Sequence, residues 1–359
     1  MIMAGGTGGH VMPALAVAEQ LRERGIDVVW LGSRRGLETR LVPQAGYRLL
    51  QIRVAGLRQA GALDRLLAPL RLLRALGEAL RLMLRERPAA VLGLGGFAAG
   101  PGGVAAWLLR RPLCLHEQNA RPGLTNRLLA PLARRVLTGF PDVPLGRAPQ
   151  WVGNPVRAAI ATLAPPPARW QDRSGPLRLL VLGGSQGAQA LNDAVCAFAA
   201  SPAAAGVAIR HQCGERNLAA VEAAYAEREL ANPQTHDGAG VRVDAFIDDM
   251  AAAYAWADLV LCRAGALTVA ELCAAGVGAL LVPYPHAADD HQTVNAQVMV
   301  AAGAGRLIAQ PELDAGRIAA ELAATGRERA LEMACAARGL ARPQAAQQVC
   351  EALLELARA

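Results

Sequence analysis

Two glycine-rich segments of the chain have the composition of anion-binding loops. The first is GGTGGH at residues 5–10 and the second is GGSQG at residues 183–187, and each follows a short apolar run. Glycines let backbone N–H groups face an anion at a helix N-terminus, where the helix dipole favours negative charge. Neither loop has the Walker spacing or G-x-G-x-x-G, which disfavours an NTPase or a dehydrogenase. Tight turns without a ligand are the alternative interpretation, and two loops at equivalent places weaken it.

Polar side chains gather at three further places. HEQN at residues 116–119 follows an apolar run, at the edge of a sheet where α/β enzymes build their sites. DDHQ at residues 289–292, with Asn295 one helical turn on, has the same pattern, although a charged helix start also explains it. Thr268 and Glu271 fit a capping box, and a glutamate there also suits the paired hydroxyls of a ribose. These readings stay open on the sequence.

The elements that position these residues repeat one plan twice. An apolar strand, a glycine-rich turn and an amphipathic helix open the chain, with the first helix predicted over residues 13–24, and the same three elements open its second half. Strands alternate with helices after each set. This alternation predicts an α/β fold with two doubly wound parallel sheets that bind ligands at the carboxyl ends of their strands. The predicted strands are residues 2–4, 28–31, 90–94, 113–115, 177–182, 207–211, 259–262 and 279–282.

A length of 359 residues fits two domains of ordinary size. The turn-rich segment 139–167 is a plausible hinge between them. We therefore expect domains at residues 1–155 and 156–342 that face a cleft. The last helical pattern, residues 343–359, either completes the second domain or crosses back to the first.

Charge is distributed unevenly along the chain. Residues 1–155 hold 21 Arg and 9 acidic residues, a net charge of +12, whereas the remainder holds 16 Arg and 21 acidic residues, a net charge of −5. So basic an N-terminal half indicates an anionic partner: phosphates, nucleic acid or an acidic membrane surface. The seven cysteines show no C-x-x-C pair, which is typical of reduced thiols in a cytoplasmic protein. The opening residues lack the pattern of a signal peptide.

An arginine-rich amphipathic helix is predicted over residues 63–87. Arg71, Arg74, Arg81 and Arg85 share one stripe by spacing, and leucines share another. A soluble helix with a solvated face explains this pattern. A basic amphipathic helix is also what a protein uses to rest on anionic lipid, so Arg71, Arg74 and Arg81 are predicted membrane contacts.

Taken together, these motifs resemble one family across nearly the whole chain. In chain order they are GGTGGH at 5–10, GGF at 95–97 with GPGG at 100–103, HEQN at 116–119, GNPVR at 153–157, GGSQG at 183–187 and CRAGALT at 262–268. The sequence resembles the bacterial peptidoglycan N-acetylglucosaminyltransferases, which convert lipid I to lipid II.

The resemblance implies a GT-B fold, with an N-terminal acceptor domain and a C-terminal domain that grips UDP-N-acetylglucosamine. It implies an inverting transfer to the 4-hydroxyl of the muramic acid of undecaprenyl-linked lipid I, by a peripheral protein at the cytoplasmic face of the cell membrane. No metal or cofactor is required in this scheme, and whether a divalent ion stimulates the transfer stays open.

Site residues follow from the same resemblance, by matching positions. Glu271 would bind the ribose hydroxyls, the Ile247 backbone the uracil, and Ser185 the diphosphate. The other expected donor contacts are Thr7, Gly8, Gly9, Asn119, Arg157, Ala266, Leu267, Thr268, Val269, Ala270 and Gln292. A general base must take the proton of the acceptor hydroxyl, and the two catalytic candidates are His10 and Glu117, of which His10 is preferred for its place in the first loop.

Two alternatives remain on the sequence. Another GT-B enzyme, a glycolipid glycosyltransferase or a UDP-sugar epimerase, would share the donor chemistry and differ in the N-terminal half. A nucleic-acid-binding protein would use the basic half, but aromatic residues make up only 4% of the chain and no binding module is recognisable. We therefore expect no nucleic-acid partner.

Overall fold

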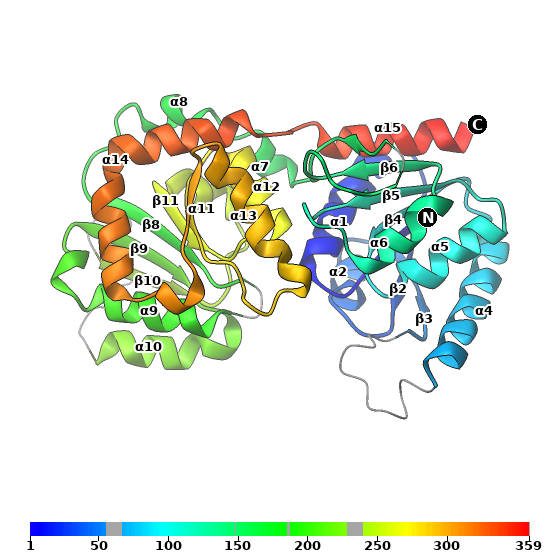
Figure 1. The fold of residues 1–359 in the computed structure, drawn as a ribbon, viewed down its shortest axis with the longest axis horizontal. Coiled ribbons are helices and arrows are strands. Elements are labelled where there is room, and N and C mark those ends of the chain that lie inside the picture. The colour runs from blue at the N-terminus through cyan, green and yellow to red at the C-terminus, as the bar shows by residue number, and fades with distance from the viewer. Residues whose placement is uncertain (55–66, 147, 185–186, 228–239, 359) are drawn as a thin grey trace. The chain divides into compact units, whose positions relative to one another are not determined.

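The computed structural model describes residues 1–54, 67–146, 148–184, 187–227 and 240–358. These residues group into two compact units (Figure 1). The first unit is Met1–Arg157 together with Arg342–Ala359, and the second is Ala158–Ala341.

The first unit is built on a seven-stranded sheet with the order β3-β2-β1-β4-β5-β6-β7. Every described pairing in it is parallel. The strands are β1 (Ile2–Ala4), β2 (Val29–Ser33), β3 (Arg48–Ile52), β4 (Val91–Gly95), β5 (Leu113–Glu117), β6 (Arg135–Thr138) and β7 (Gln150–Trp151). The order reverses at β1, and such a switch point is where doubly wound sheets bind ligands.

Helices cover both faces of this sheet (Figure 1). They are α1 (Gly8–Glu23), α2 (Glu38–Gln44), α4 (Ala68–Glu86), α5 (Ala99–Leu108), α6 (Leu124–Leu129) and α15 (Ala345–Arg358), with a short 3-10 turn η1 (Ala130–Leu132). The C-terminal helix α15 packs on α1. Its buried Val349, Cys350 and Leu353 join the core formed by β1, β4 and α1, so the end of the chain completes the first unit.

The second unit repeats the plan with a six-stranded sheet of order β10-β9-β8-β11-β12-β13. Its described pairings are also parallel. The strands are β8 (Leu177–Leu182), β9 (Val207–Gln212), β10 (Gly240–Asp244), β11 (Leu259–Cys262), β12 (Gly278–Leu281) and β13 (Gly305–Leu307). Both sheets thus have the strand order of a dinucleotide-binding fold, which confirms the predicted fold class.

The helices of the second unit alternate with its strands along the chain. They are α7 (Ala158–Ala161), α8 (Pro166–Trp170), α9 (Gln189–Ala199), α10 (Leu218–Ala226), α11 (Met250–Trp256), α12 (Ala266–Ala275), α13 (His291–Ala301) and α14 (Ala315–Gly339). Short 3-10 turns are η2 (Pro202–Ala204), η3 (Glu215–Asn217), η4 (Ala288–Asp290) and η5 (Gln310–Glu312). The core lies between β8, β9, β11 and the covering helices α9 and α14.

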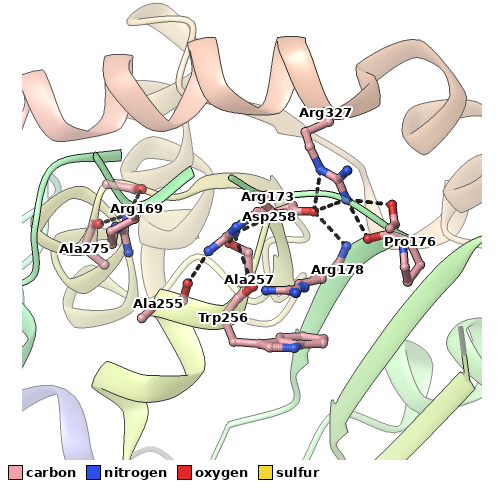
Figure 2. A network of polar contacts seen from close by, with 12 residues as sticks. Arg169, Arg173, Pro176, Arg178, Ala255, Trp256, Ala257, Asp258, Ala275 and Arg327 are labelled. Atoms are coloured by element: carbon pink, nitrogen blue, oxygen red, sulfur yellow. Dashed lines mark hydrogen bonds and ion pairs between the residues drawn. The ribbon is translucent and has the colours of Figure 1, made fainter. Parts of the chain in front are cut away.

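A buried ionic network ties the amino ends of β8 and β11 together (Figure 2). Asp258, fully buried, accepts hydrogen bonds from the Arg173 guanidinium at 2.6 Å and from the Arg178 backbone N–H at 3.0 Å. Arg327 of α14 reaches the same carboxylate at 3.2 Å. Arg173 also donates to the carbonyl of Ala255 at 2.6 Å, at the end of α11. Two strands and two helices therefore depend on one carboxylate.

The structure corrects two details of the sequence interpretation. The first helix was expected to begin at Pro13, but α1 begins at Gly8 and carries Pro13 inside it, so the glycines of the first loop form its first turn. The leucine stripe of the arginine-rich helix does not face the core: α4 is buried through Ala75, Ala79 and Met83, whereas Leu70 and Leu73 are exposed. Small alanines let α4 approach α5 closely, which leaves the leucines outward.

The structure also bears on membrane insertion. Residues 91–109 carry no charged side chain, and they form strand β4, a glycine turn and helix α5 in place of one long apolar helix. Among the described residues, no helix is long and apolar enough to cross a bilayer.

Candidate functional site

The first glycine loop is held in place by a buried carboxylate. Glu38, at the start of α2 and fully buried, accepts hydrogen bonds from the Gly6 N–H at 2.8 Å, the Ser33 N–H at 3.1 Å and the Ser33 hydroxyl at 2.6 Å. A Cβ on Gly5 would lie 2.5 Å from Glu38 Oε1. Glycine is therefore required here because the carboxylate occupies the space of a side chain.

A second pair of glycines supports the same loop from β4. Gly95 and Gly96 have φ angles of +100° and +83°, in the region that favours glycine. A Cβ on Gly96 would contact the backbone of Gly5, including its carbonyl carbon at 3.1 Å. A Cβ on Gly95 would lie 3.0 Å from Cε1 of His10. The His10 ring and the first loop thus rest directly on a glycine backbone.

Glu117, at the end of β5, is saturated with hydrogen bonds. Its Oε1 accepts from the backbone and side-chain amides of Asn119 at 2.9 and 3.2 Å, and its Oε2 accepts from the Gly123 N–H at 3.0 Å and from Asn126 at 2.8 Å. The residue is 1% exposed. These contacts favour a role in ordering the loop 119–126 over the role of general base that the sequence left open for it.

A different line of hydrogen bonds reaches His10. Its Nδ1 lies 2.8 Å from Oε1 of Gln118, and Nε2 of Gln118 lies 3.0 Å from Nδ1 of His116. The Nε2 atom of His116 lies 2.9 Å from the carbonyl oxygen of Gly153. Complete burial lowers the pKa of His116 below its ordinary value, against smaller opposing effects of the Gly153 hydrogen bond and of Glu117. His116 is therefore neutral near pH 7. His10, at the other end of this line of hydrogen bonds, is half-buried.

The second glycine loop lies at the carboxyl end of β8 and is fixed by an amide. Gln212, at the end of β9, accepts from the Gly184 N–H at 3.0 Å and donates to the Gly184 carbonyl at 3.1 Å. Gly187 has a φ angle of +73°, and a Cβ there would overlap the side chain of Asn217. Ser185, the expected diphosphate contact, lies outside the described residues. Each loop is therefore pinned by a buried side chain, Glu38 in one unit and Gln212 in the other.

The predicted capping box at Thr268 is wrong. Helix α12 begins at Ala266 with Gly265 as its N-cap, in extended backbone and without a capping side-chain hydrogen bond, so Thr268 already lies inside the helix. Glu271 is 7% exposed and accepts a hydrogen bond from the hydroxyl of Tyr254, at 3.2 Å. Its carboxylate is thus held within the second unit by a contact that the capping-box pattern does not contain, and ribose binding stays a prediction.

The other expected donor contacts of the second unit lie at the same edge of its sheet. Ile247 follows β10 and is 4% exposed, and Gln292 lies in the first turn of α13. The side-chain oxygen of Gln292 accepts from the Tyr284 N–H at 3.0 Å, in the loop after β12. The residues Ala266, Leu267, Thr268, Val269, Ala270 and Glu271 form the first two turns of α12, after β11. All of them are therefore placed by the carboxyl ends of β10, β11 and β12.

In the first unit, the structure brings together Thr7, Gly8, Gly9, His10, Glu117 and Asn119 at the carboxyl ends of β1 and β5. Arg157 is the last residue before the second unit. Sequence reasoning missed Glu38, Gln212 and Tyr254. Glu38 had no local signal because it looks like an ordinary acidic residue in a first helical turn, and its partner Gly6 is 32 residues away.

Metal ligation finds no support among the residues that the structure describes. No group of three or more His, Cys, Asp or Glu side chains in them is placed to hold a metal ion. The first unit offers backbone N–H groups at the start of α1 and the half-buried imidazole of His10. The second unit offers backbone N–H groups at the start of α9 and the buried carboxylate of Glu271 on α12.

Two parallel sheets with related strand orders, each with a glycine loop at the carboxyl ends of its strands, are the two domains of a GT-B fold, which many glycosyltransferases share. Residues 1–138 match the N-terminal domain of glycosyltransferase family 28, and residues 178–349 match its C-terminal domain. The chain belongs to glycosyltransferase family 28. Its full-length relatives are named N-acetylglucosamine transferases, and it is an enzyme of that class.

Similar proteins cover the chain from end to end. The UDP-N-acetylglucosamine–N-acetylmuramyl-(pentapeptide) pyrophosphoryl-undecaprenol N-acetylglucosamine transferase of Alkalilimnicola ehrlichii is 57% identical over 100% of this chain and 99% of its own length. The protein of the same name from Nitrosococcus oceani is 54% identical over 99% of this chain and 98% of its own length. The crystal structure of Acinetobacter baumannii MurG is 38% identical, covers 99% of each chain and has a TM-score of 0.82.

A more distant structure shares the fold only. The UDP-GlcNAc 2-epimerase from Neisseria meningitidis, solved with bound UDP-GlcNAc, has a TM-score of 0.66 over 99% of each chain at 12% identity.

Proposed function

We propose that this protein transfers N-acetylglucosamine from UDP-N-acetylglucosamine to the 4-hydroxyl of the muramic acid of lipid I, with inversion at the sugar C1, and so makes lipid II. The observation that carries this proposal is the full-length identity of 57% with a transferase named for that donor and that acceptor. The chain is only 12% identical to the UDP-GlcNAc 2-epimerase, and that likeness supports a shared fold and not a shared reaction.

In this proposal the second glycine loop and the start of α9 receive the diphosphate. Negative charge grows on the departing UDP as the bond from the sugar C1 to its oxygen breaks, and N–H groups at a helix start stabilise that charge without reorganising. Gln212 supports this role because it engages both the N–H and the C=O of Gly184 and thereby fixes the loop. Ser185 is the proposed side-chain contact to the diphosphate.

Glu271 is the proposed ligand of the ribose hydroxyls. A carboxylate oxygen accepts from two neighbouring hydroxyls, and the hydrogen bond from Tyr254 orients the group for it. The backbone of Ile247 is proposed to bind the uracil. The remaining proposed donor contacts are Thr7, Gly8, Gly9, Asn119, Arg157, Ala266, Leu267, Thr268, Val269, Ala270 and Gln292.

His10 is the proposed general base that takes the proton of the acceptor hydroxyl as the new bond forms. Its ring is half-buried, is engaged at Nδ1 by Gln118 and lies against Gly95. Glu117 is the weaker candidate because four N–H donors already occupy its carboxylate. We therefore assign Glu117 the role of ordering the loop that carries Asn119.

We further propose that the first unit rests on the cytoplasmic face of the cell membrane. Helix α4 packs against α5, and α5 packs against α6. These three helices expose large apolar side chains, with Leu70 at 67%, Leu73 at 65%, Trp107 at 51% and Leu128 at 67% exposure. Exposed apolar side chains on neighbouring elements, interleaved with arginines, are typical of a membrane-binding surface.

Sedimentation with anionic vesicles tests this surface. Each basic residue near the membrane contributes about 1 kcal/mol, so reversing three of them to Glu should weaken binding by at least roughly 100-fold. The variant is the triple reversal of Arg71, Arg74 and Arg81. The matched control is a triple reversal on the second unit, at Arg216, Arg306 and Arg329. Equal binding of both variants would remove α4 from the membrane contact.

UDP release with defined acceptors tests the transferase assignment. The protein and UDP-N-acetylglucosamine are incubated with a lipid I analogue, with diacylglycerol or with no acceptor. We expect rapid UDP release with the lipid I analogue only. Release with diacylglycerol would assign a glycolipid glycosyltransferase, and epimerised nucleotide sugar without any acceptor would assign an epimerase.

A further inference from the structure

A chain of side-chain hydrogen bonds leads from the backbone of Gly153 to the imidazole of His10. The links are the Gly153 carbonyl to His116 Nε2 at 2.9 Å, His116 Nδ1 to Gln118 Nε2 at 3.0 Å, and Gln118 Oε1 to His10 Nδ1 at 2.8 Å. His116 and Gln118 are buried, at 0% and 1% exposure. Solvent therefore does not compete for the inner links.

The orientation of the Gln118 amide follows from an atom that can only accept. Its Nε2 lies 2.9 Å from the backbone carbonyl oxygen of His116, in addition to the contact with the His116 ring. A carbonyl oxygen has lone pairs and no proton, so the amide nitrogen, which carries two donors, must face it. The amide oxygen is then left facing His10.

The state of His116 agrees with this orientation. The Gly153 carbonyl also only accepts, so Nε2 of His116 carries the proton of the neutral ring. Its Nδ1 is then a bare lone pair and accepts from the Gln118 amide. Burial lowers the pKa of His116, which keeps the ring in this neutral form. Each of the three hydrogen bonds between Gly153 and His10 therefore has one possible donor and one possible acceptor.

Gln118 is itself anchored at its backbone. Asn154 donates from Nδ2 to the Gln118 carbonyl at 2.9 Å. Gly153, next to Asn154, has a φ angle of +89°, and a Cβ there would overlap the side chain of Arg342. The backbone at Gln118 and at Gly153 therefore has little freedom to move.

We infer that Gln118, oriented by His116, is a positioning residue that keeps the proton of neutral His10 on Nδ1 and leaves Nε2 as the bare nitrogen. This inference rests on the proposed function, in which His10 takes the proton of the acceptor hydroxyl. An imidazole with its proton on Nδ1 can accept a proton only at Nε2. The His10 ring also lies close to the backbone of Gly95, since a Cβ on Gly95 would be 3.0 Å from His10 Cε1.

Nitrogen NMR of the protein labelled with 15N-histidine tests the inference without any substrate. Correlations between ring nitrogens and ring protons differ for the Nδ1–H and Nε2–H tautomers, and the His10 signals are those missing from His10→Gln. We expect Nδ1–H for neutral His10 in the wild type. Gln118→Met, which is similar in shape but has no amide, should lose this pattern. Gln51→Met, at an exposed glutamine of β3, should keep it.

Steady-state kinetics of the same variants supply the second readout. Because the tautomer matters only when the proton moves, Gln118→Met should lower kcat about tenfold and change the KM for UDP-N-acetylglucosamine by less than about twofold. Nε2–H for wild-type His10, or an unchanged His10 pattern in Gln118→Met, would overturn the inference. Absence of lipid-dependent UDP release would instead remove the proposed function, and the NMR result would still decide the tautomer.

Discussion

Replacing Gly96 by alanine tests whether the turn after β4 holds the first glycine loop. Gly96 has a φ angle of +83°, and a Cβ there would press on the backbone of Gly5. The left-handed conformation costs a residue with a Cβ about 1–2 kcal/mol. Forcing packed backbones apart costs about 1–3 kcal/mol more. The free energy of unfolding of the first unit should therefore fall by about 2–5 kcal/mol.

Two other glycines of the same unit separate these contributions. Gly25 has a φ angle of +71° and nothing within 4 Å of a Cβ position, so Gly25→Ala should lose only the conformational part, about 1–2 kcal/mol. Gly77 lies in α4 with nothing within 4 Å, so Gly77→Ala should gain up to about 1 kcal/mol.

Urea unfolding of the three variants and the wild type is the measurement. The order of stability should be Gly77→Ala, wild type, Gly25→Ala and then Gly96→Ala. If Gly96→Ala is no less stable than Gly25→Ala, the contact between the two loops does not contribute and the reasoning is refuted.

Three further outcomes are expected. Glu271→Ala should raise the KM for UDP-N-acetylglucosamine at least about tenfold while leaving the fold intact by circular dichroism, and an unaltered KM would refute the ribose role. Asp258→Asn removes the charge opposite Arg173, whose side chain is 6% exposed, so the free energy of unfolding should fall by about 3–5 kcal/mol. A loss below about 1 kcal/mol would show that the carbonyl contacts of Arg173 stabilise its charge without Asp258. Burial lowers the pKa of His211 from 6.5 to about 4, so the unfolded chain binds more protons between these pH values and the free energy of unfolding should fall as the pH drops through that window. In His211→Gln the free energy of unfolding, measured with urea, should depend less steeply on pH. Equal pH dependence in the wild type and the variant would contradict the shift.

Much of the fold was predictable because parallel strands are buried on both faces. The run 259–262 is apolar throughout and the run 177–182 is apolar except for Arg178, and the structure has strands at both. Helix starts were less predictable. Pro13 resembles a first helical residue, yet α1 begins five residues earlier at Gly8. Glycine is a poor helix former, so Gly8 and Gly9 did not indicate a helix start in the sequence.

The site features that the sequence did not predict depend on contacts between residues far apart in the chain. The box of Thr268 and Glu271 is a local pattern, but Gly265 starts the helix a turn earlier and Tyr254, 17 residues before Glu271, holds the carboxylate. His116 and Gln118 stood in a recognisable motif, whereas their roles follow from Gly153, 37 residues beyond His116. Periodicity reports the faces of single elements and carries no record of such pairings.

Product analysis of the reaction tests the central claim most directly. Lipid I and UDP-N-acetylglucosamine are incubated with the wild type and with His10→Ala, and the lipid product is examined by mass spectrometry and by NMR of the new anomeric centre. The account predicts a β-1,4-linked disaccharide on the undecaprenyl diphosphate with the wild type, and formation slowed about 100-fold or more in His10→Ala. A lipid that gains no sugar would contradict the transfer, and an undiminished rate in His10→Ala would contradict the base.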